Sequence, residues 1–208
     1  MANKEKKKMI ADVAFDLFLS NGYMPTKIID IAKKAGIGKG TVYEYFDSKE
    51  SILLYLIENC VAVEYAQMME KIRDCQGNTE EKLRLYLRQE TEFIKKYGRY
   101  IDDMKRQFLQ ANTDIAEDIM EAVLGIVRMQ LTTVMKMVED GIAEGVFRNI
   151  NPQFTTSCIT SYVSAYLTSS FCFNFNYKGS KGEIVEMPGA QEYNEDELLD
   201  IIMHGIGA

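Results

Sequence analysis

The chain has 208 residues, of which 47% are hydrophobic and only 3 are proline. That length holds one large domain or two small ones, and few prolines together with long helix-period patterns favour an all-α fold. Its 4 cysteines form no Cys-x-x-Cys pair, its only histidine is His204, and we find no apolar run long enough to span a bilayer. We therefore expect a cytoplasmic protein with no metal, no cofactor, no membrane partner and reduced, mostly buried thiols.

The charge is distributed unevenly along the chain. The net charge is -7, but residues 1–50 carry 9 Lys and 7 Asp or Glu, a net +2, which leaves -9 for the remainder. A locally positive segment can bind phosphates, while an acidic body limits nonspecific binding along nucleic acid. The small positive excess is also compatible with chance, so charge alone does not establish a nucleic-acid partner.

The first quarter of the chain is expected to form three helices. Apolar residues recur every three to four positions over residues 4–20, and Gly22 suits the left-handed position that ends this helix. Thr26 is the expected N-cap of a second helix. Gly36 makes the turn between that helix and a short third one over residues 39–45.

Further helices are expected along the rest of the chain. Asp47 is the expected cap of a long fourth helix, with Glu50 completing a capping box. The expected spans are residues 48 to about 73, residues 79–97, a short segment after Gly98, residues 114–143, residues 152 to about 174 behind Asn151-Pro152, and a last helix capped by Asn194. Residues 178–193 are expected to form a loop. The sequence thus predicts an all-α protein of about nine helices.

The expected third helix separates its apolar and polar side chains. Val42 and Phe46 lie four residues apart and would anchor it to a core. The opposite face matches a recognition helix that enters a DNA major groove. It carries Lys39, Gly40, Tyr43 and Glu44, with Thr41 and Tyr45 beside them.

Each of these side chains has a possible role in reading DNA. Lys39 can donate to guanine or to a phosphate, and Glu44 can accept from cytosine. The hydroxyls of Thr41, Tyr43 and Tyr45 can donate to phosphates, which sets register without reading sequence. Gly40 removes a side chain where backbone approaches the duplex closely.

Two lysines stand at the starts of the flanking helices. Lys27 and Lys49 lie where side-chain charge and free backbone N–H groups both favour phosphate. Ordinary alternatives remain open for several of these residues. In these alternatives Tyr45 packs against the core, Glu44 is only a solvated residue, and Lys27 is an ordinary surface lysine.

One set of residues in this segment has a distinctive spacing. It comprises Phe18, Gly22, Thr26, Asp30-Ile31-Ala32, Ala35-Gly36-Ile37, Gly40-Thr41, Tyr43, Tyr45-Phe46 and Lys49-Glu50. The set closely resembles the helix-turn-helix motif of the TetR family of bacterial transcriptional regulators. The resemblance implies a homodimer, usually a repressor, in which a small molecule bound to the body releases DNA. In the family, the positions matching Lys39, Thr41, Tyr43, Tyr45 and Lys49 contact the operator.

The resemblance also implies two domains. Residues 1–48 would form a three-helix DNA-binding domain, and residues 49–208 a helical ligand-binding and dimerisation domain. Two positions depart from the family pattern. Gly38 stands where a serine often caps the recognition helix, and Ile29 stands where a polar DNA-contacting residue is common.

The body carries a stripe of small residues that permits close approach of two helices. Its members are Ser157, Ser161, Ala165, Thr168 and Cys172. Together with Leu198 and Ile202 of the last helix, this stripe favours a four-helix bundle across a two-fold axis. Tight packing inside one subunit is the alternative.

The body is also rich in tyrosine, phenylalanine and methionine. A candidate effector pocket comprises Tyr86, Phe93, Met104, Phe108, Met120, Tyr162 and Tyr166, although most such residues simply form a core. The acidic body favours a cationic or neutral ligand. We find no base–nucleophile arrangement and expect no enzyme activity.

We therefore predict a ligand-responsive regulator, most simply a repressor, whose partners are a pseudo-palindromic double-stranded DNA operator, a small-molecule effector and a second copy of the chain. The alternative is a helical small-molecule-binding protein or enzyme without DNA binding. An activator that binds DNA with a protein partner is a third hypothesis.

Overall fold

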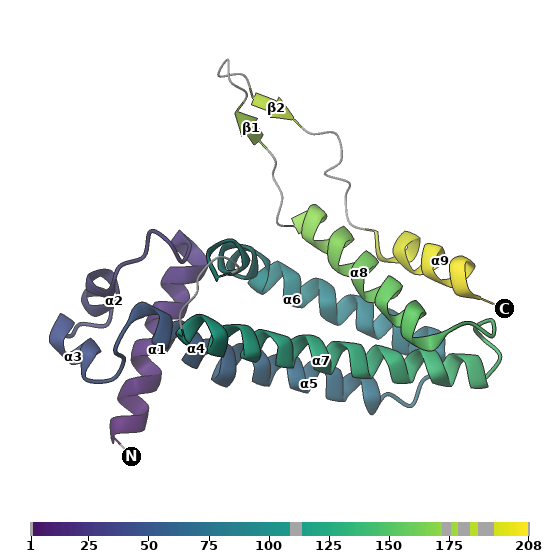
Figure 1. Ribbon diagram of the computed structural model, residues 1–208, viewed down its shortest axis with the longest axis horizontal. Helices are drawn as coiled ribbons and strands as arrows, with labels where there is room; N and C mark the ends of the chain where they lie inside the picture. Colours follow the sequence, from purple (N-terminus) through teal and green to yellow (C-terminus); the bar gives the residue numbers. More distant parts are fainter. Residues whose placement is uncertain (1, 109–113, 172–175, 179–183, 187–193, 208) are drawn as a thin grey trace. The chain divides into compact units, whose positions relative to one another are not determined.

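The computed structural model describes residues 2–108, 114–171, 176–178, 184–186 and 194–207 (Figure 1). Helix predominates among them, which confirms the predicted fold class. In chain order the elements are α1 (Ala2–Asn21), α2 (Ile28–Lys34), α3 (Lys39–Tyr43), α4 (Lys49–Leu56), a π-helical turn η1 (Ile57–Val61), α5 (Ala62–Arg73), α6 (Thr79–Phe108), α7 (Asp114–Ala143), α8 (Pro152–Phe171), β1 (Asn176–Lys178), β2 (Ile184–Glu186) and α9 (Glu195–Ile206).

Helix continuity differs from the prediction at one position. As expected, α4, η1 and α5 follow one another without a break from Lys49 to Arg73. The predicted break at Gly98 is wrong, because α6 continues through it to Phe108. Gly98 is buried, and the packing of α6 outweighs the roughly 1 kcal/mol by which glycine disfavours a helix relative to alanine. With Lys49–Arg73 taken as one helix, the described residues contain eight helices instead of nine.

The start of α2 also differs from the prediction. The N-cap is Lys27, whose backbone N–H donates to Oδ2 of Asp30 at 3.1 Å. Thr26 is buried, and its hydroxyl donates backwards to the carbonyl of Gly22 at 2.8 Å. Thr26 is therefore not the cap of α2 but a support for the end of α1.

The N-cap of α4 also differs from the prediction, and it lies one residue later in the chain. Ser48 is its N-cap, and the Ser48 hydroxyl accepts from the Ser51 N–H at 3.1 Å. The Ser51 hydroxyl accepts in return from the Ser48 N–H at 3.1 Å. The prediction of a cap by Asp47 with Glu50 is wrong, because these two serines complete the reciprocal pair.

Other predicted helix ends are confirmed. Gly22 has a φ of +88° and Gly36 a φ of +67°, which are left-handed values that favour glycine. The Asn151 side chain accepts from the Phe154 N–H at 2.9 Å at the start of α8. The Asn194 side chain accepts from two N–H groups in the first turn of α9.

Packing divides the chain into two compact units. Unit 1 comprises Met1–Ala66 with Arg99–Val127, and unit 2 comprises Gln67–Gly98 with Arg128–Ala208. The long helices α6 and α7 therefore contribute residues to both. The division after residue 48 inferred from the family resemblance stays a prediction.

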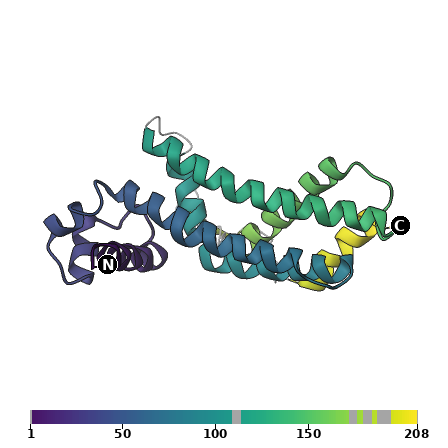
Figure 2. The same ribbon diagram turned by 90° about the horizontal axis from the view of Figure 1, so that it is seen from below.

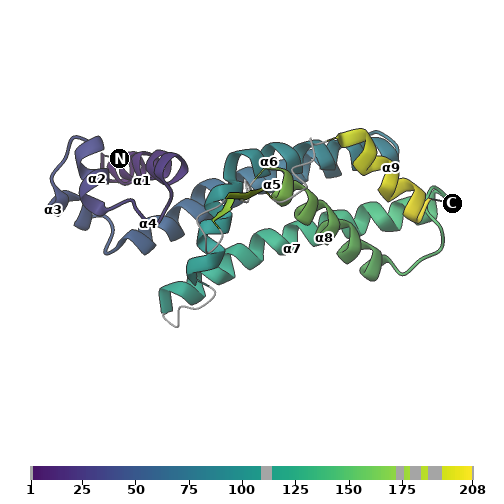
Figure 3. The same ribbon diagram turned by 90° about the horizontal axis from the view of Figure 1, so that it is seen from above.

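In unit 1, α1, α2 and α3 pack around the start of α4 (Figure 3). The core of this group is formed by fully buried apolar side chains from each helix. They are Ile10, Ala14 and Phe18 of α1, Ile31 and Ala32 of α2, Val42 of α3, and Ile52, Leu53 and Leu56 of α4. This packing leaves the face of α3 opposite Val42 exposed.

In unit 2, stretches of α5, α6 and α7 run along one another (Figures 1 and 2), and polar contacts tie these helices together. Arg73 at the end of α5 donates to Thr133 of α7 at 3.3 Å, and Gln130 of α7 donates to Tyr86 of α6 at 3.0 Å. The Thr79 hydroxyl at the start of α6 donates to Glu144 beyond α7 at 2.6 Å. These contacts join α5, α6 and α7 into one bundle.

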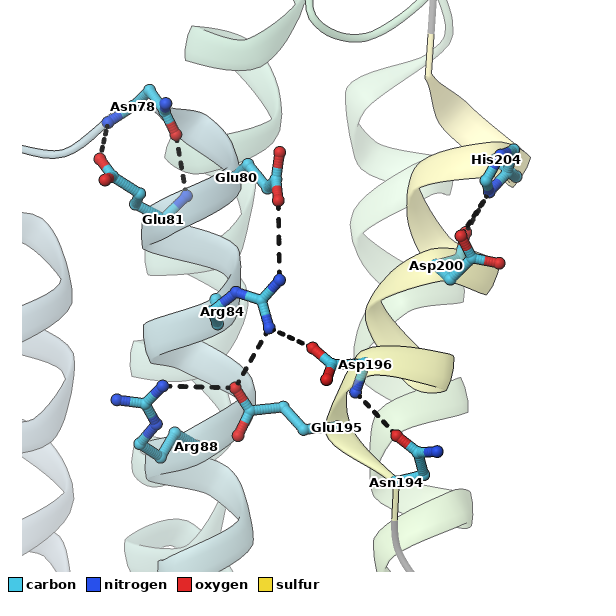
Figure 4. A network of polar contacts seen from close by, with 10 residues as sticks. All are labelled: Asn78, Glu80, Glu81, Arg84, Arg88, Asn194, Glu195, Asp196, Asp200 and His204. Atoms are coloured by element: carbon cyan, nitrogen blue, oxygen red, sulfur yellow. Dashed lines mark hydrogen bonds and ion pairs between the residues drawn. The ribbon is translucent and has the colours of Figure 1, made fainter.

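Charged residues join α6 to α9 (Figure 4). Arg84 lies 3.8 Å from Glu195 and also donates to Asp196, while Arg88 lies 3.5 Å from Glu195. The carboxylates raise the pKa of Arg84, chiefly through the hydrogen bond to Asp196. Because the pairs are solvent-exposed, they orient the first turn of α9 more than they stabilise the fold.

A short antiparallel β-ladder replaces part of the loop expected over residues 178–193. Asn176 pairs with Glu186, Tyr177 with Val185 and Lys178 with Ile184. This ladder lies between α8 and α9 in the chain.

The helix from Lys49 to Arg73 is long and apolar enough, by length and composition alone, to cross a membrane. This departs from our sequence-based expectation that no run has these properties. Its apolar stripe is packed inside the protein, with Leu53, Leu56 and Met69 fully buried. A helix that buries its apolar residues in this way serves as a core helix.

Candidate nucleic-acid interface

The short helix α3 segregates its side chains as the sequence predicts. Val42 is fully buried and Phe46, just beyond the helix, is nearly so. Phe46 packs edge-on against Tyr55 of α4, with 5.6 Å between ring centroids. Lys39 and Tyr43 lie on the exposed side, and 45% of the Tyr43 side chain is accessible. The helix is thus held from one side and open on the other.

The turn before α3 is stabilised by backbone hydrogen bonds. The N–H of Gly36 donates to the Lys33 carbonyl at 3.2 Å, and the N–H of Ile37 donates to the Ala32 carbonyl at 3.0 Å. These two bonds form a Schellman motif, which requires the left-handed conformation of Gly36. Gly38 then caps α3 with an extended backbone and no side-chain acceptor. This turn sets the direction in which α3 leaves α2.

The remaining predicted contacts on α3 differ in exposure. Gly40 and Glu44 are exposed, whereas Thr41 and Tyr45 are half-buried. A Cβ added at Gly40 would meet no atom within 4 Å. The backbone at Gly40 is therefore open to a ligand that approaches from outside. Tyr45 lies in the turn after α3 rather than in the helix itself.

The two flanking lysines behave differently. Lys27 is exposed at the start of α2 and remains available to an anion. The Lys49 ammonium instead donates to the backbone carbonyls of Tyr23, Met24 and Thr26, at 2.9, 3.3 and 3.1 Å. Because an ammonium group has three N–H donors, these bonds occupy all of them. In this structure the Lys49 ammonium therefore faces the loop between α1 and α2, and its contact with an operator phosphate stays a prediction.

The environment of Lys49 is partly apolar. Its ammonium lies 4.1 Å from the centroid of the Tyr23 ring. Partial burial lowers the pKa of Lys49, and the neighbouring carboxylate of Glu50 opposes part of that shift. The charge of Lys49 is evident from the sequence, but no residue type indicates the three backbone carbonyls that surround it.

The predicted effector-pocket residues fall in several environments. Tyr86 is fully buried and Phe93 nearly so, both on α6 in unit 2. Met120 is half-buried in unit 1. Tyr162 is 41% exposed on α8, so it does not line a closed interior. The Tyr166 hydroxyl accepts from the Asn194 N–H at 3.3 Å. Met104 and Phe108 belong to α6, but their side chains lie outside the described residues.

A buried polar group that was not predicted from the sequence lies beside Tyr86. Glu90 lies one helical turn further along α6 and is only 5% exposed. Burial raises the pKa of Tyr86 well above its ordinary value, the charge of Glu90 raises it further, and the hydrogen bond from Gln130 opposes both. The spacing of Tyr86 and Glu90 was a usable signal, because residues four apart share one face of a helix.

The predicted dimer residues divide between surface and interior. Ser157, Ser161 and Ala165 are exposed along α8, as a contact face requires. Leu198 and Ile202 are buried inside unit 2, so these two side chains are not presented to a partner. The α9 side chain that is exposed instead is Ile201. The side chain of Thr168 and all of Cys172 lie outside the described residues.

Comparisons with known proteins show which regulators this chain is similar to. Residues 10–56 match the sequence profile described as bacterial regulatory proteins, tetR family. The fatty acid metabolism regulator protein of Bacillus subtilis is 26% identical over 169 residues, which cover 80% of this chain and 87% of that protein.

Solved structures share the fold over nearly the whole chain. The transcriptional regulator FadR from Bacillus subtilis in complex with stearoyl-CoA superposes with a TM-score of 0.66 at 22% identity, covering 96% of this chain and 98% of that one. A transcriptional regulator from Saccharomonospora viridis in complex with choline has a TM-score of 0.77 at 17% identity, with 99% of each chain covered.

Proposed function

Because this chain belongs to the TetR family of bacterial regulatory proteins, we propose that it is a ligand-responsive transcriptional repressor that acts in the cytoplasm. As a homodimer it binds a pseudo-palindromic DNA operator. The observation that carries the proposal is the division of α3 into a buried face at Val42 and an exposed face at Lys39 and Tyr43. A helix held in this way can enter a major groove without disturbing its own core.

A two-fold symmetric dimer matches an operator whose two half-sites form a pseudo-palindrome. Two recognition helices read half-sites separated by about one helical turn of DNA, roughly 34–36 Å, or somewhat more. The exposed face of α8 supports this assembly, because it combines the small residues Ser161 and Ala165 with Phe154, which is 72% exposed. Ile201 of α9 is a further large apolar side chain that is exposed. Small residues let two helices approach, and large apolar ones gain from being covered.

The effector acts by changing the fraction of dimers whose two recognition helices have the spacing of the operator half-sites. A coupling free energy of about 1–3 kcal/mol is typical of such control. We propose a cationic or neutral effector, because the body is acidic and Glu90 places a buried carboxylate beside Tyr86.

Selection of duplexes from a random library by the purified protein tests DNA binding and identifies the operator sequence in the same experiment. We expect a pseudo-palindrome to be enriched, and the double variant Lys39→Ala, Tyr43→Ala to enrich nothing. The variant keeps Val42 and Phe46, so it should fold. Failure of the native protein to retain any duplex at low salt would favour a helical small-molecule-binding protein or an enzyme instead.

Choline and stearoyl-CoA are suitable first probes of the effector site because their charges are opposite. A ligand present at 100 times its dissociation constant stabilises its protein by about 2.7 kcal/mol, which a thermal melt detects. We expect choline, or another cation of similar size, to raise the melting temperature and to release the selected duplex. Stabilisation by stearoyl-CoA alone would contradict the proposed charge preference.

A further inference from the structure

The positive charge of the first fifty residues is concentrated at the start of α1. Residues 1–8 contain four lysines and one glutamate, a net +3, whereas residues 9–50 contain five lysines and six acidic residues, a net -1. The second of these segments includes the rest of α1 and all of α2 and α3. The two helices of the helix-turn-helix therefore lie in a segment with no net attraction for a polyanion, and the lysines before it carry the charge that attracts one.

The recognition helix itself carries little net charge. Lys39 lies on the exposed side of α3, and exposed Glu44 follows the helix directly, so these two charges offset each other. Contacts with phosphates supply a large share of the affinity of a DNA-binding protein, whereas contacts with base edges supply its specificity. The exposed face of α3 is thus suited to reading sequence, and much of the affinity has to come from cations elsewhere.

The first two turns of α1 lie beside the connection between α3 and α4. The Lys7 ammonium is 5.0 Å from the centroid of the Phe46 ring and 5.2 Å from that of the Tyr55 ring. Phe46 lies just beyond α3, and Tyr55 belongs to α4. Because Lys7 is half-buried, its cation–π contacts fix the start of α1 at this place. The lysines around it are thereby held next to the helices that would read DNA.

The other three lysines of this segment are exposed. Lys4, Lys6 and Lys8 all reach solvent, and Lys4 and Lys8 share one face of α1 because they are four residues apart. Lys8 lies 3.7 Å from Asp12, with 70% and 55% of the two side chains accessible. Such an exposed pair is worth at most about 1 kcal/mol, so Lys8 can exchange this carboxylate for a phosphate. Several ammonium groups on one rigid helix suit a polymer of regularly spaced phosphates.

We infer that Lys4, Lys6 and Lys8 form a second DNA-contacting surface, the α1 basic patch, which binds backbone phosphates beside each half-site and supplies a large part of the salt-dependent affinity. The inference rests on the proposed function, since it assigns affinity to α1 and sequence recognition to α3. Because the patch contacts only phosphates, it acts alike on every sequence.

Salt dependence measures the contribution of the patch. Each lysine that neutralises a phosphate contributes about 0.9 to the slope of log affinity against log salt concentration, and a dimer presents two copies of the patch. The patch variant combines Lys4→Gln, Lys6→Gln and Lys8→Gln, which leaves Lys7 and the buried face of α1 intact. Its affinity and that of the native protein are measured over a series of KCl concentrations. The probes are the duplex selected by the native protein and a random-sequence duplex of equal length.

A charge-matched control separates the place of the lysines from their number. The control variant combines Lys71→Gln, Lys95→Gln and Lys136→Gln, which removes three exposed lysines from unit 2. Both variants have the same net charge, so a difference between them comes from where the charges lie. Glutamine forms helices about as well as lysine, and both variants should therefore melt close to the native temperature.

For the patch variant we expect the salt slope to become shallower by roughly five, and both duplexes to bind at least about a hundredfold more weakly in 0.1 M KCl. Repeating the duplex selection at lower salt should enrich the native motif. The control variant should keep the native slope. Equal slopes in the two variants would overturn the inference. A changed motif in the patch variant would do so too, because it would mean that the substitutions disturb α3.

Arginine substitution tests charge without removing it. The combination of Lys4→Arg, Lys6→Arg and Lys8→Arg keeps three cations that bind phosphate at least as well as lysine does. We expect this variant to keep the native salt slope and native affinity for both duplexes. A loss as large as that of the patch variant would contradict a role that depends on charge.

Neutral methylphosphonate groups locate the phosphates that the patch contacts. One phosphate of the selected duplex is replaced at a time, and binding of the native protein and of the patch variant is compared. Phosphates that the patch contacts should weaken the native protein when they are neutralised and have no further effect on the patch variant. Absence of any position that distinguishes the two proteins would overturn a direct contact.

The same measurements separate the patch from the proposed function. If the native protein binds the random duplex without enriching any motif, operator recognition fails, while a shallower slope in the patch variant still supports the patch. If a motif is enriched and the patch variant keeps the slope of the control, the repressor proposal stands and the patch fails. A basic helix can also bind an anionic membrane. Binding of the native protein to phosphatidylglycerol vesicles but to no duplex would overturn both.

Discussion

The ammonium of Lys39 lies over the ring of Tyr43, with 5.5 Å between Nζ and the ring centroid. The two residues are one helical turn apart on the exposed side of α3. A cation–π contact at an exposed site is worth about 0.5–1 kcal/mol. That is less than the roughly 1–3 kcal/mol typical of a good contact with a base edge, so Lys39 can leave the ring when DNA arrives. The tyrosine ring holds the lysine in position without competing strongly with the duplex.

Tyr43→Phe tests the hydroxyl separately from the ring. The variant keeps the ring beside Lys39, so each subunit of the dimer loses only a hydrogen bond of about 1 kcal/mol, which together is equivalent to a loss in affinity of roughly thirtyfold. We expect this loss on the selected duplex and on random duplexes alike, because a phosphate contact carries no sequence information. Fluorescence anisotropy measures both affinities, with Tyr162→Phe on α8 as the control. Unchanged binding by Tyr43→Phe would exclude a contact through this hydroxyl.

Lys39→Ala should change specificity as well as affinity. Removal of a lysine that contacts a base costs about 1–3 kcal/mol in each half-site of the selected sequence and relaxes the preference at one base pair there. Repeating the duplex selection with the variant measures this directly. An identical enriched motif with a lower salt slope would mean that Lys39 contacts only a phosphate.

Gly40→Ala should stabilise the protein and yet weaken its binding to DNA. An added Cβ at Gly40 meets nothing within 4 Å, and alanine favours a helix over glycine by up to about 1 kcal/mol. Gly125 in α7 provides a matched control, since a Cβ there also meets nothing within 4 Å. Both variants should melt at a higher temperature, but only Gly40→Ala should lose affinity. Equal affinity in the two variants would mean that the backbone at Gly40 does not approach the duplex.

The sequence predicted the buried and exposed faces of α3 because helical spacing alone separates Val42 and Phe46 from Lys39 and Tyr43. The Gly36 turn was predictable for a similarly local reason, since a left-handed residue at a helix end is usually glycine. These features depend on residues that are close in the chain.

The errors arose where several neighbouring residues were chemically suitable. Thr26 and Asp47 are good capping residues, and only the burial of Thr26 and the reciprocal bonds of Ser48 decide which position caps each helix. The surroundings of Lys49 were not predictable, because its acceptors are backbone carbonyls of the distant α1–α2 loop that no residue type reveals. Tertiary contacts of this kind override local preference.

Ala165→Glu tests the proposed dimer face. Ala165 is exposed on α8, in line with Ser157 and Ser161. A carboxylate at this position blocks close approach of two helices and meets its own symmetry mate across a two-fold axis. We expect a monomer in light scattering and a loss of cooperative operator binding. Thr132→Glu, at an exposed position of α7, is the charge-matched control and should stay dimeric. A dimeric Ala165→Glu protein would place the interface elsewhere.

Tyr86 should make the protein sensitive to alkali. Burial, followed by the charge of Glu90, raises the pKa of Tyr86 well above its ordinary value, so the folded protein keeps the neutral phenol. In the unfolded chain this phenol ionises near pH 10. The stability contributed by neutral Tyr86 is therefore present below about pH 10 and is lost as the pH rises further, by about 1.4 kcal/mol per unit until the folded protein also ionises.

Tyr86→Phe cannot ionise at this position, and it loses only the hydrogen bond from Gln130, worth about 1 kcal/mol. We expect the native protein to be the more stable of the two at neutral pH and the difference to shrink, then reverse, above about pH 10. Urea unfolding of both proteins across this range measures the difference. Tyr162→Phe, at a tyrosine that is 41% exposed, should follow the native curve throughout. Parallel curves for the native protein and Tyr86→Phe would show that Tyr86 ionises as readily in the folded state as in the unfolded one, which its complete burial beside a carboxylate does not allow.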